Sequence, residues 1–110
     1  MMEPSEFIQA WMLAVAAFNE GNLEPLADRL AENCDWADVG SSRDEIMQAI
    51  KAQRDEGWVR HDVLSIATED GAVVGIARNT MADGSSWLVS GCFKLDADGR
   101  IEKLRHIDHL

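Results

Sequence analysis

The chain has 110 residues, of which 46% are hydrophobic, so it can build one packed core and is not expected to be disordered. Its formal net charge of −10 repels phosphate backbones and anionic lipid headgroups, which argues against nucleic acid and membrane surfaces as partners. Cys34 and Cys92 form no CxxC pair, and the acidic N-terminus is unlike a secretory signal. We expect one domain over residues 1–110, with reduced thiols, in the cytoplasm.

The first half of the sequence predicts helices. Apolar residues recur at steps of three and four over residues 7–18, which places them on one face of a helix. Ser5 is the expected N-terminal cap of this helix and Gly21 its expected end. A second helix is expected to begin at Asn22, with an apolar stripe that reaches Leu30.

A third helix is expected after the short extended segment "CDWADV". Ser42 and Glu45 stand three residues apart, which is the spacing of a capping box. Ile46 and Ile50 continue one apolar face, and Gly57 is the expected end.

The second half of the sequence predicts strands. Asp-Gly pairs at 70–71, 83–84 and 98–99 separate runs that are rich in residues typical of strands, and Asp-Gly is typical of tight hairpin turns. Four long strands joined by three hairpins form an antiparallel meander. Helices followed by strands indicate an α+β fold in which the helices pack on one face of a curved sheet.

Three segments of the sequence together resemble the nuclear transport factor 2 superfamily, in particular its SnoaL-like branch. They are "AAFNEGNLEPLADRLAENCDW", "GSSRDEIMQAI" and the closing "FKLDADGRIEKLRHID", and they cover most of the chain. The resemblance implies a cone-shaped roll, in which three N-terminal helices pack on a strongly curved antiparallel sheet around a pocket. It also implies a homodimer that forms through the outer face of the sheet.

Ketosteroid isomerases of this superfamily offer one comparison for activity. Their base is an aspartate before a "VGS"-like loop, and "ADVGS" makes Asp38 the matching residue here. Their oxyanion donors are not matched, because the corresponding positions are Ala14 and Gly91 and the chain has no tyrosine. The resemblance therefore implies the fold and a candidate base, and not steroid isomerisation.

Alternation along the strands predicts where polar side chains converge. On the last strand, His106 and Asp108 share a face, and in the superfamily's register that face looks into the cone. On the strand of residues 72–81, the same reasoning assigns Val74, Ile76, Arg78 and Thr80 to the inner face. Asp38 is expected at the mouth of the pocket. A slip of one residue would turn these groups outward.

Four residues are thus candidates for acid–base chemistry: Asp38, Arg78, His106 and Asp108. Each has a structural alternative. Arg78 and Asp108 could form only an ion pair, His106 could lie in solvent at the rim, and Asp38 could serve only the turn. Trp11, Trp36 and Trp87 are the expected aromatic wall, with a core role as the alternative. No metal or cofactor is expected, because His106 and His109 point to opposite faces of a strand.

Two classes of function follow from these residues. The first is a protein that binds a compact apolar molecule and that acts without a cofactor as an acid–base enzyme of isomerase, dehydratase or cyclase type. The second is a non-catalytic dimer that serves as a ligand-binding or association module. It is favoured by apolar and small residues on the other face of the strands, such as Leu88, Ser90 and Cys92.

Overall fold

The computed structural model describes residues 3–108, apart from the side chains of residues 4, 69, 107 and 108. Its helices are α1 (Pro4–Asn19), α2 (Glu24–Ala27) and α3 (Arg43–Asp55). Its strands are β1 (Leu30–Trp36), β2 (Trp58–Glu69), β3 (Ala72–Met81), β4 (Ser86–Leu95) and β5 (Ile101–Asp108). No helix within this described range is long and apolar enough to cross a membrane.

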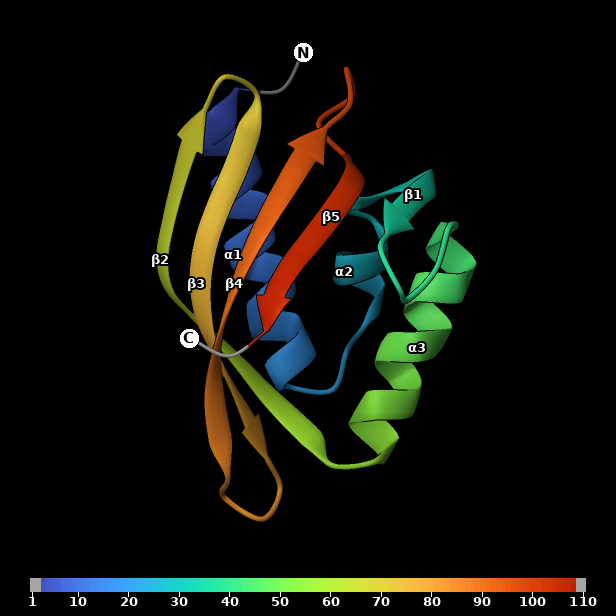
Figure 1. Cartoon of the computed structure of the whole chain (residues 1–110), viewed down its shortest axis with the longest axis vertical. Coiled ribbons are helices and arrows are strands. Elements are labelled where there is room, and N and C mark those ends of the chain that lie inside the picture. Colours follow the sequence, from blue (N-terminus) through green and yellow to red (C-terminus); the bar gives the residue numbers. More distant parts are fainter. Residues whose placement is uncertain (1–2, 109–110) are drawn as a thin grey trace.

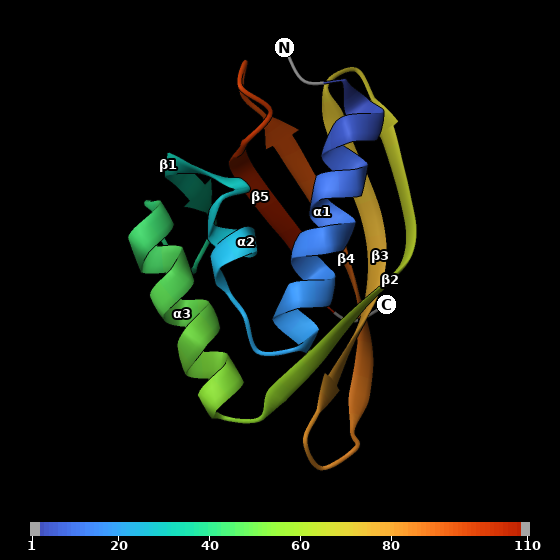
Figure 2. The ribbon, with the colours of Figure 1, turned by 180° about the vertical axis from the view of Figure 1, so that it is seen from behind.

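The five strands form one bent sheet in the order β1-β5-β4-β3-β2. β1 runs parallel to β5, and the other neighbouring strands pair antiparallel (Figure 1). The helices all lie on one side of this sheet, with α1 across its concave face and α3 beside the edge strand β1 (Figure 2). The α+β prediction is therefore confirmed, with helices packed on a curved sheet.

The hairpin predictions are confirmed at all three Asp-Gly pairs. Gly71, Gly84 and Gly99 have φ angles of 78°, 90° and 79°, which a side chain with a Cβ rarely adopts. They connect β2 to β3, β3 to β4 and β4 to β5. This short connectivity holds the four long strands in a meander.

The helix boundaries agree with the sequence only in part. Ser5 is not the cap of α1: the helix begins at Pro4 after Glu3, whose carbonyl accepts from the amides of Glu6 and Phe7. Proline suits this place because the first amides of a helix lack helical partners. At α3, half of the predicted capping box is confirmed: the Glu45 amide donates to Ser42 Oγ at 3.2 Å, while the Glu45 carboxylate accepts from the Ser41 amide instead of that of Ser42.

The second predicted helix is too long. α2 ends at Ala27, and Leu30, assigned to its apolar stripe, is the first residue of β1. Leu30 is only 2% exposed and pairs with Ile101, whose amide donates to the Arg29 carbonyl at 2.7 Å. Burial in the sheet thus replaces burial along a helix.

The core fills the concave side of the sheet. Its largest side chains come from α1, where Phe7 and Phe18 are almost fully buried. Trp11 packs edge-on against Phe93 of β4 at 4.8 Å between ring centroids, and Ile46 of α3 is fully buried. Since α1 and α3 lie side by side on the same concave side of the sheet, the space between them is where a pocket can open.

The prediction for the inner face of β3, which named Val74, Ile76, Arg78 and Thr80, is wrong. Val73, Ala77 and Asn79 are 2%, 7% and 8% exposed, whereas Val74 and Ile76 are 50% and 37% exposed. The inner face therefore carries the odd-numbered residues of β3. On β4, Val89 is 4% exposed and pairs with Ala77, so it lies on the same inner face.

Candidate functional site

Three cavities that share wall residues lie on the concave side of the sheet. The largest, which we call the vestibule, has a volume of about 470 Å³ and is bordered by Trp36, Trp58, Trp87 and polar side chains. The inner cavity, about 60 Å³, lies between α1, α3 and β5 and is walled mainly by apolar side chains. The sheet-side cavity, about 30 Å³, lies against β2, β3 and β4. Because they share wall residues, the three cavities adjoin one another.

His106 is the residue that all three cavities share. It lies on β5 opposite Gly91 of β4, and its ring meets the ring of Trp36 edge-on at 4.9 Å between centroids. A Cβ added at Gly91 would lie 3.2 Å from His106 Cδ2. Glycine at this position therefore leaves the room that the imidazole occupies.

A second histidine lies deeper, at the start of β2. His61 forms one row with Asn79 of β3 and Trp87 of β4, because these three residues are paired across the inner face of the sheet. Its Nδ1 lies 2.6 Å from Asn79 Oδ1, and the indole Nε1 of Trp58 donates to the same oxygen at 3.1 Å. Its ring borders both the inner cavity and the sheet-side cavity.

The backbone of His61 is held by α1. Asn19 at the end of that helix accepts from the His61 amide at 2.7 Å and donates to the His61 carbonyl at 3.0 Å. The side chain of Asn19 thus imitates the pair of hydrogen bonds that a neighbouring strand would form. This contact joins helix to sheet at the place where His61 enters the core.

Burial lowers the pKa of His61 below its ordinary value. The hydrogen bond that His61 donates to Asn79 and the negative charge of Asp62 oppose this shift, but loss of hydration outweighs both. His61 is therefore held in its neutral form near pH 7. A neutral imidazole can both donate and accept a hydrogen bond.

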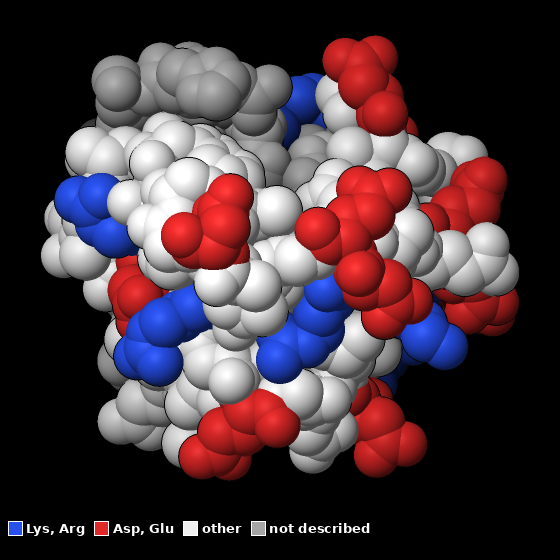
Figure 3. Space-filling model, turned by 90° about the horizontal axis from the view of Figure 1, so that it is seen from below, with Lys and Arg blue, Asp and Glu red and all other residues white. Residues whose placement is uncertain are grey.

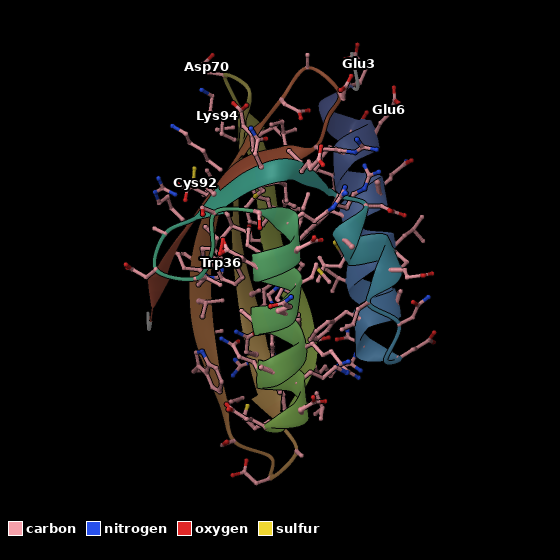
Figure 4. The ribbon with its side chains drawn as sticks, turned by 90° about the vertical axis from the view of Figure 1, so that its right-hand side faces the viewer. Glu3, Glu6, Trp36, Asp70, Cys92 and Lys94 are labelled. Atoms are coloured by element: carbon pink, nitrogen blue, oxygen red, sulfur yellow. The ribbon has the colours of Figure 1, made fainter. Side chains whose placement is uncertain are left out.

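The three predicted wall tryptophans all border a cavity. Trp11 lies against the two smaller cavities, Trp36 against the inner cavity and the vestibule, and Trp87 against the vestibule. Trp36 lies at the end of β1, beside the start of α3 (Figure 4). Trp11 and Trp36 are also core residues, 7% and 9% exposed, so the core alternative holds for both.

Asp38 borders the vestibule and is exposed. Its φ angle is 67°, within the turn that carries β1 back to Gly40. Aspartate tolerates this left-handed conformation better than most residues. The position of Asp38 therefore also fits the alternative, in which this residue serves the turn.

Arg78 is not brought to the site. Its side chain is exposed on the outer face, where Nη1 donates to Ser86 Oγ at 3.2 Å. The side chain of Asp108 lies outside the described residues, although its backbone pairs with Val89 at the end of β5. The arginine at the vestibule is instead Arg105, whose Nη2 lies 3.3 Å from Asp35 Oδ2.

Sequence reasoning missed His61, Asn79 and Trp58. The signal that could have found them is the pairing of β2 with β3 through the Asp70–Gly71 turn, since counting back from that turn brings residue 61 opposite residue 79, once the irregularity between Val63 and Ser65 is included. The wrong face of β3 hid this pair.

Neither cysteine belongs to the site. Burial raises the pKa of the Cys34 thiol to about 11, with a smaller effect from Asp35, so this thiol stays protonated. Cys92 is exposed on the side of the sheet away from the helices (Figure 4). Among the described residues, no cluster of three or more His, Cys, Asp or Glu side chains could hold a metal ion.

Acidic side chains surround the end of the molecule toward which the β3–β4 hairpin extends, with basic side chains lying among them (Figure 3). The excess of acidic over basic side chains on this face is in keeping with the net charge of −10 of the whole chain. Such a field disfavours anionic molecules that approach it.

Comparison with known proteins relates the chain to others by structure and not by sequence. No protein-family model matches the sequence, and no curated protein matches it. A candidate polyketide cyclase from Sinorhizobium meliloti superposes with a TM-score of 0.76 at 16% identity, covering 90% of this chain and 94% of the other. A candidate isomerase of the SnoaL-like family from Agrobacterium tumefaciens gives 0.73 at 19% identity, covering 93% and 96%.

A third similar structure contains a small molecule. TerC co-crystallised with polyporic acid superposes with a TM-score of 0.73 at 14% identity, covering 92% of this chain and 88% of the other. These comparisons show that the chain has the NTF2-like cone fold, and they confirm the fold that the sequence resemblance implies. Because one fold hosts many activities, the activity has to be argued from the site.

Proposed function

We propose that this protein binds a compact, mostly apolar organic molecule in the vestibule, with part of that molecule reaching the inner cavity. One observation carries the proposal. A vestibule of about 470 Å³ bordered by three tryptophans adjoins an apolar cavity, and the polar, exposed His106 borders both. Ligand sites typically combine such an apolar wall with a few convergent polar groups. The candidate cyclase and the TerC complex, which share the fold, support the same kind of ligand.

Cofactor-free acid–base catalysis of isomerase, dehydratase or cyclase type is the activity that we propose for this site. His106 is suited to exchange a proton with the bound molecule, since an imidazole near neutral pH is an effective acid and base. Asp38 borders the same vestibule and is the candidate base at its mouth. Asp108 remains a proposed partner of His106, and Arg78, which lies on the outer face, has no part in the proposal.

Blocking the cavity tests the binding proposal. Val89 borders the vestibule and the sheet-side cavity and is 4% exposed, so Val89→Phe should fill part of the vestibule. Val74→Phe makes the same change on the exposed outer face and serves as the matched control. With 4-ethylphenol as the probe, followed by calorimetry, we expect wild type and Val74→Phe to bind it and Val89→Phe to lose at least tenfold in affinity. Equal binding by all three proteins would contradict the proposal.

Catalysis has its own test. Once a reactive compound is found among those that bind, Asp38→Asn and His106→Ala should each abolish its turnover while circular dichroism shows a folded protein. Full activity in both variants would refute the assignment of these two residues.

A dimer is the second candidate function, and the outer face of the sheet favours it. Leu64, Val74 and Ile76 are exposed there at 55%, 50% and 37%. In this reading the protein is a non-catalytic homodimer that serves as a ligand-binding or association module. Light scattering coupled to size-exclusion chromatography should give twice the monomer mass for wild type and the monomer mass for Val74→Glu. A monomeric wild type at micromolar concentration would exclude it.

A further inference from the structure

The orientation of the Asn79 amide follows from its neighbours. The indole Nε1 of Trp58 can only donate a hydrogen bond, so the Asn79 atom 3.1 Å away must be the oxygen. The same oxygen lies 2.6 Å from His61 Nδ1. An amide oxygen can only accept, and His61 Nδ1 must therefore carry a hydrogen.

This contact decides which nitrogen of His61 is free to accept. A neutral imidazole carries one hydrogen, so a hydrogen on Nδ1 leaves a lone pair on Nε2. Burial supports the neutral form. Among the side chains that the structure describes, none forms a hydrogen bond with Nε2, although the ring borders the inner cavity and the sheet-side cavity.

The frame around His61 holds the ring in this state. Asn19 fixes its backbone through two hydrogen bonds, and Trp58 occupies the other face of the Asn79 oxygen while its ring packs against Phe18 at 4.7 Å. Asn79 is itself only 8% exposed. If the ring turned over, or if its hydrogen moved to Nε2, the nitrogen that faces the Asn79 oxygen would have no hydrogen to donate. A buried group would then lack its partner, which is unfavourable.

We propose that His61 Nε2 is the hydrogen-bond acceptor that selects the ligand, and that the ligand class is neutral ring compounds carrying a hydroxyl group, such as phenols. This inference rests on the proposed function, since it assigns a second polar contact to the same cavities. A hydroxyl hydrogen matches the lone pair, whereas a ketone or carboxylate oxygen would bring a second lone pair against it. The remaining walls nearby, such as Val63, Ile66 and Phe93, are apolar and offer no competing hydrogen-bond partner.

The state of the ring can be tested without a ligand. Long-range ¹H–¹⁵N correlation spectra at pH 7.5 should show His61 with its hydrogen on Nδ1, and Asn79→Leu should shift the population toward Nε2. A wild-type spectrum with the hydrogen on Nε2 would overturn the inference, because the acceptor would then face Asn79.

The selection of the ligand is tested with a matched pair of probes, 4-ethylphenol and ethylbenzene, which differ only in the hydroxyl group. One added hydrogen bond should make 4-ethylphenol bind wild type roughly threefold to tenfold more tightly. In His61→Phe, which keeps an aromatic ring, this preference should vanish while ethylbenzene still binds.

The two proposals fail differently in this experiment. Equal binding of both probes to wild type would leave the cavity a binding site and overturn the role of His61. Binding of neither probe would contradict the proposed function and the inference together. A preference for 4-ethylphenol that persists in His61→Phe would assign the selection to another residue and refute the inference.

Discussion

Replacing Asn79 with leucine tests the buried network at its centre. The leucine side chain is similar in size and removes the oxygen that accepts from Trp58 Nε1 and His61 Nδ1. Trp58 Nε1 also lies 3.1 Å from the Arg60 carbonyl, so it keeps an acceptor. The variant should therefore leave one buried group, His61 Nδ1, without a partner.

The expected magnitude follows from that single group. An unpaired buried polar group costs about 1–3 kcal/mol, so Asn79→Leu should lower the free energy of unfolding by about that amount. Replacing both partners with apolar side chains removes the unpaired group, so Asn79→Leu in a His61→Phe background should cost about 1 kcal/mol or less. The two substitutions should therefore be coupled by about 1–2 kcal/mol.

Urea unfolding at pH 7.5 measures all four proteins of this cycle. Circular dichroism at 222 nm is the suitable signal, because Trp58 lies within the network and its fluorescence would change with the substitutions. A loss below about 0.5 kcal/mol in Asn79→Leu, or additive effects of the two changes, would refute the hydrogen bond as the reason for this arrangement.

Three further outcomes are expected. Gly91→Ala places a methyl group 3.2 Å from His106 Cδ2 and should weaken the binding of 4-ethylphenol, measured by calorimetry, by several fold. The free energy of unfolding should stay within about 1 kcal/mol of wild type. Unchanged affinity would place the ligand elsewhere. Because the pKa of His61 is lowered in the folded protein, the unfolded chain takes up this proton first as pH falls below about 6.5. The free energy of unfolding should therefore decline from that pH downward, and less steeply in His61→Phe. Parallel curves of urea stability against pH for the two proteins would contradict this. Ser42→Ala removes the acceptor of the Glu45 amide and should cost about 1 kcal/mol in urea unfolding, whereas no loss would show that the cap is not needed.

The direction of the pH effect depends on the groups around His61. Asp62 is the carboxylate whose charge acts on the ring, and it is itself paired with Arg60 at 2.9 Å. His106, like His61, borders the inner cavity and the sheet-side cavity. Comparison of wild type with His61→Phe isolates the contribution of His61 from these neighbours.

The sequence predicts the fold well because its turns and caps are local. Each Asp-Gly pair sets a hairpin through the conformation of two residues, and Ser42 acts on an amide three positions away. Such signals need no knowledge of distant contacts. Leu30 shows the limit of local reasoning, because its apolar spacing fits a helix while its pairing with Ile101 makes it a strand residue.

The site is harder to predict because it depends on register. On β3 both faces carry apolar residues: Val74 and Ile76 lie on the outer face, while Val73 and Ala77 lie on the inner face beside the polar Asn79. Hydrophobicity alone therefore does not select the inner face. β2 also has register shifts, one of them between Val63 and Ser65, so that simple alternation fails along it. His61 and Asn79 become recognisable as a pair only once both strands are placed.

An NMR titration with 4-ethylphenol tests most directly whether this cone binds a small molecule. In ¹H–¹⁵N spectra, we expect saturable shifts for the indole groups of Trp36, Trp58 and Trp87 and for the amides of Val89 and Gly91, whose residues border the cavities. Residues 64 and 74 on the outer face should shift little. Shifts confined to that outer face, or none that saturate, would contradict the proposed binding of a small molecule.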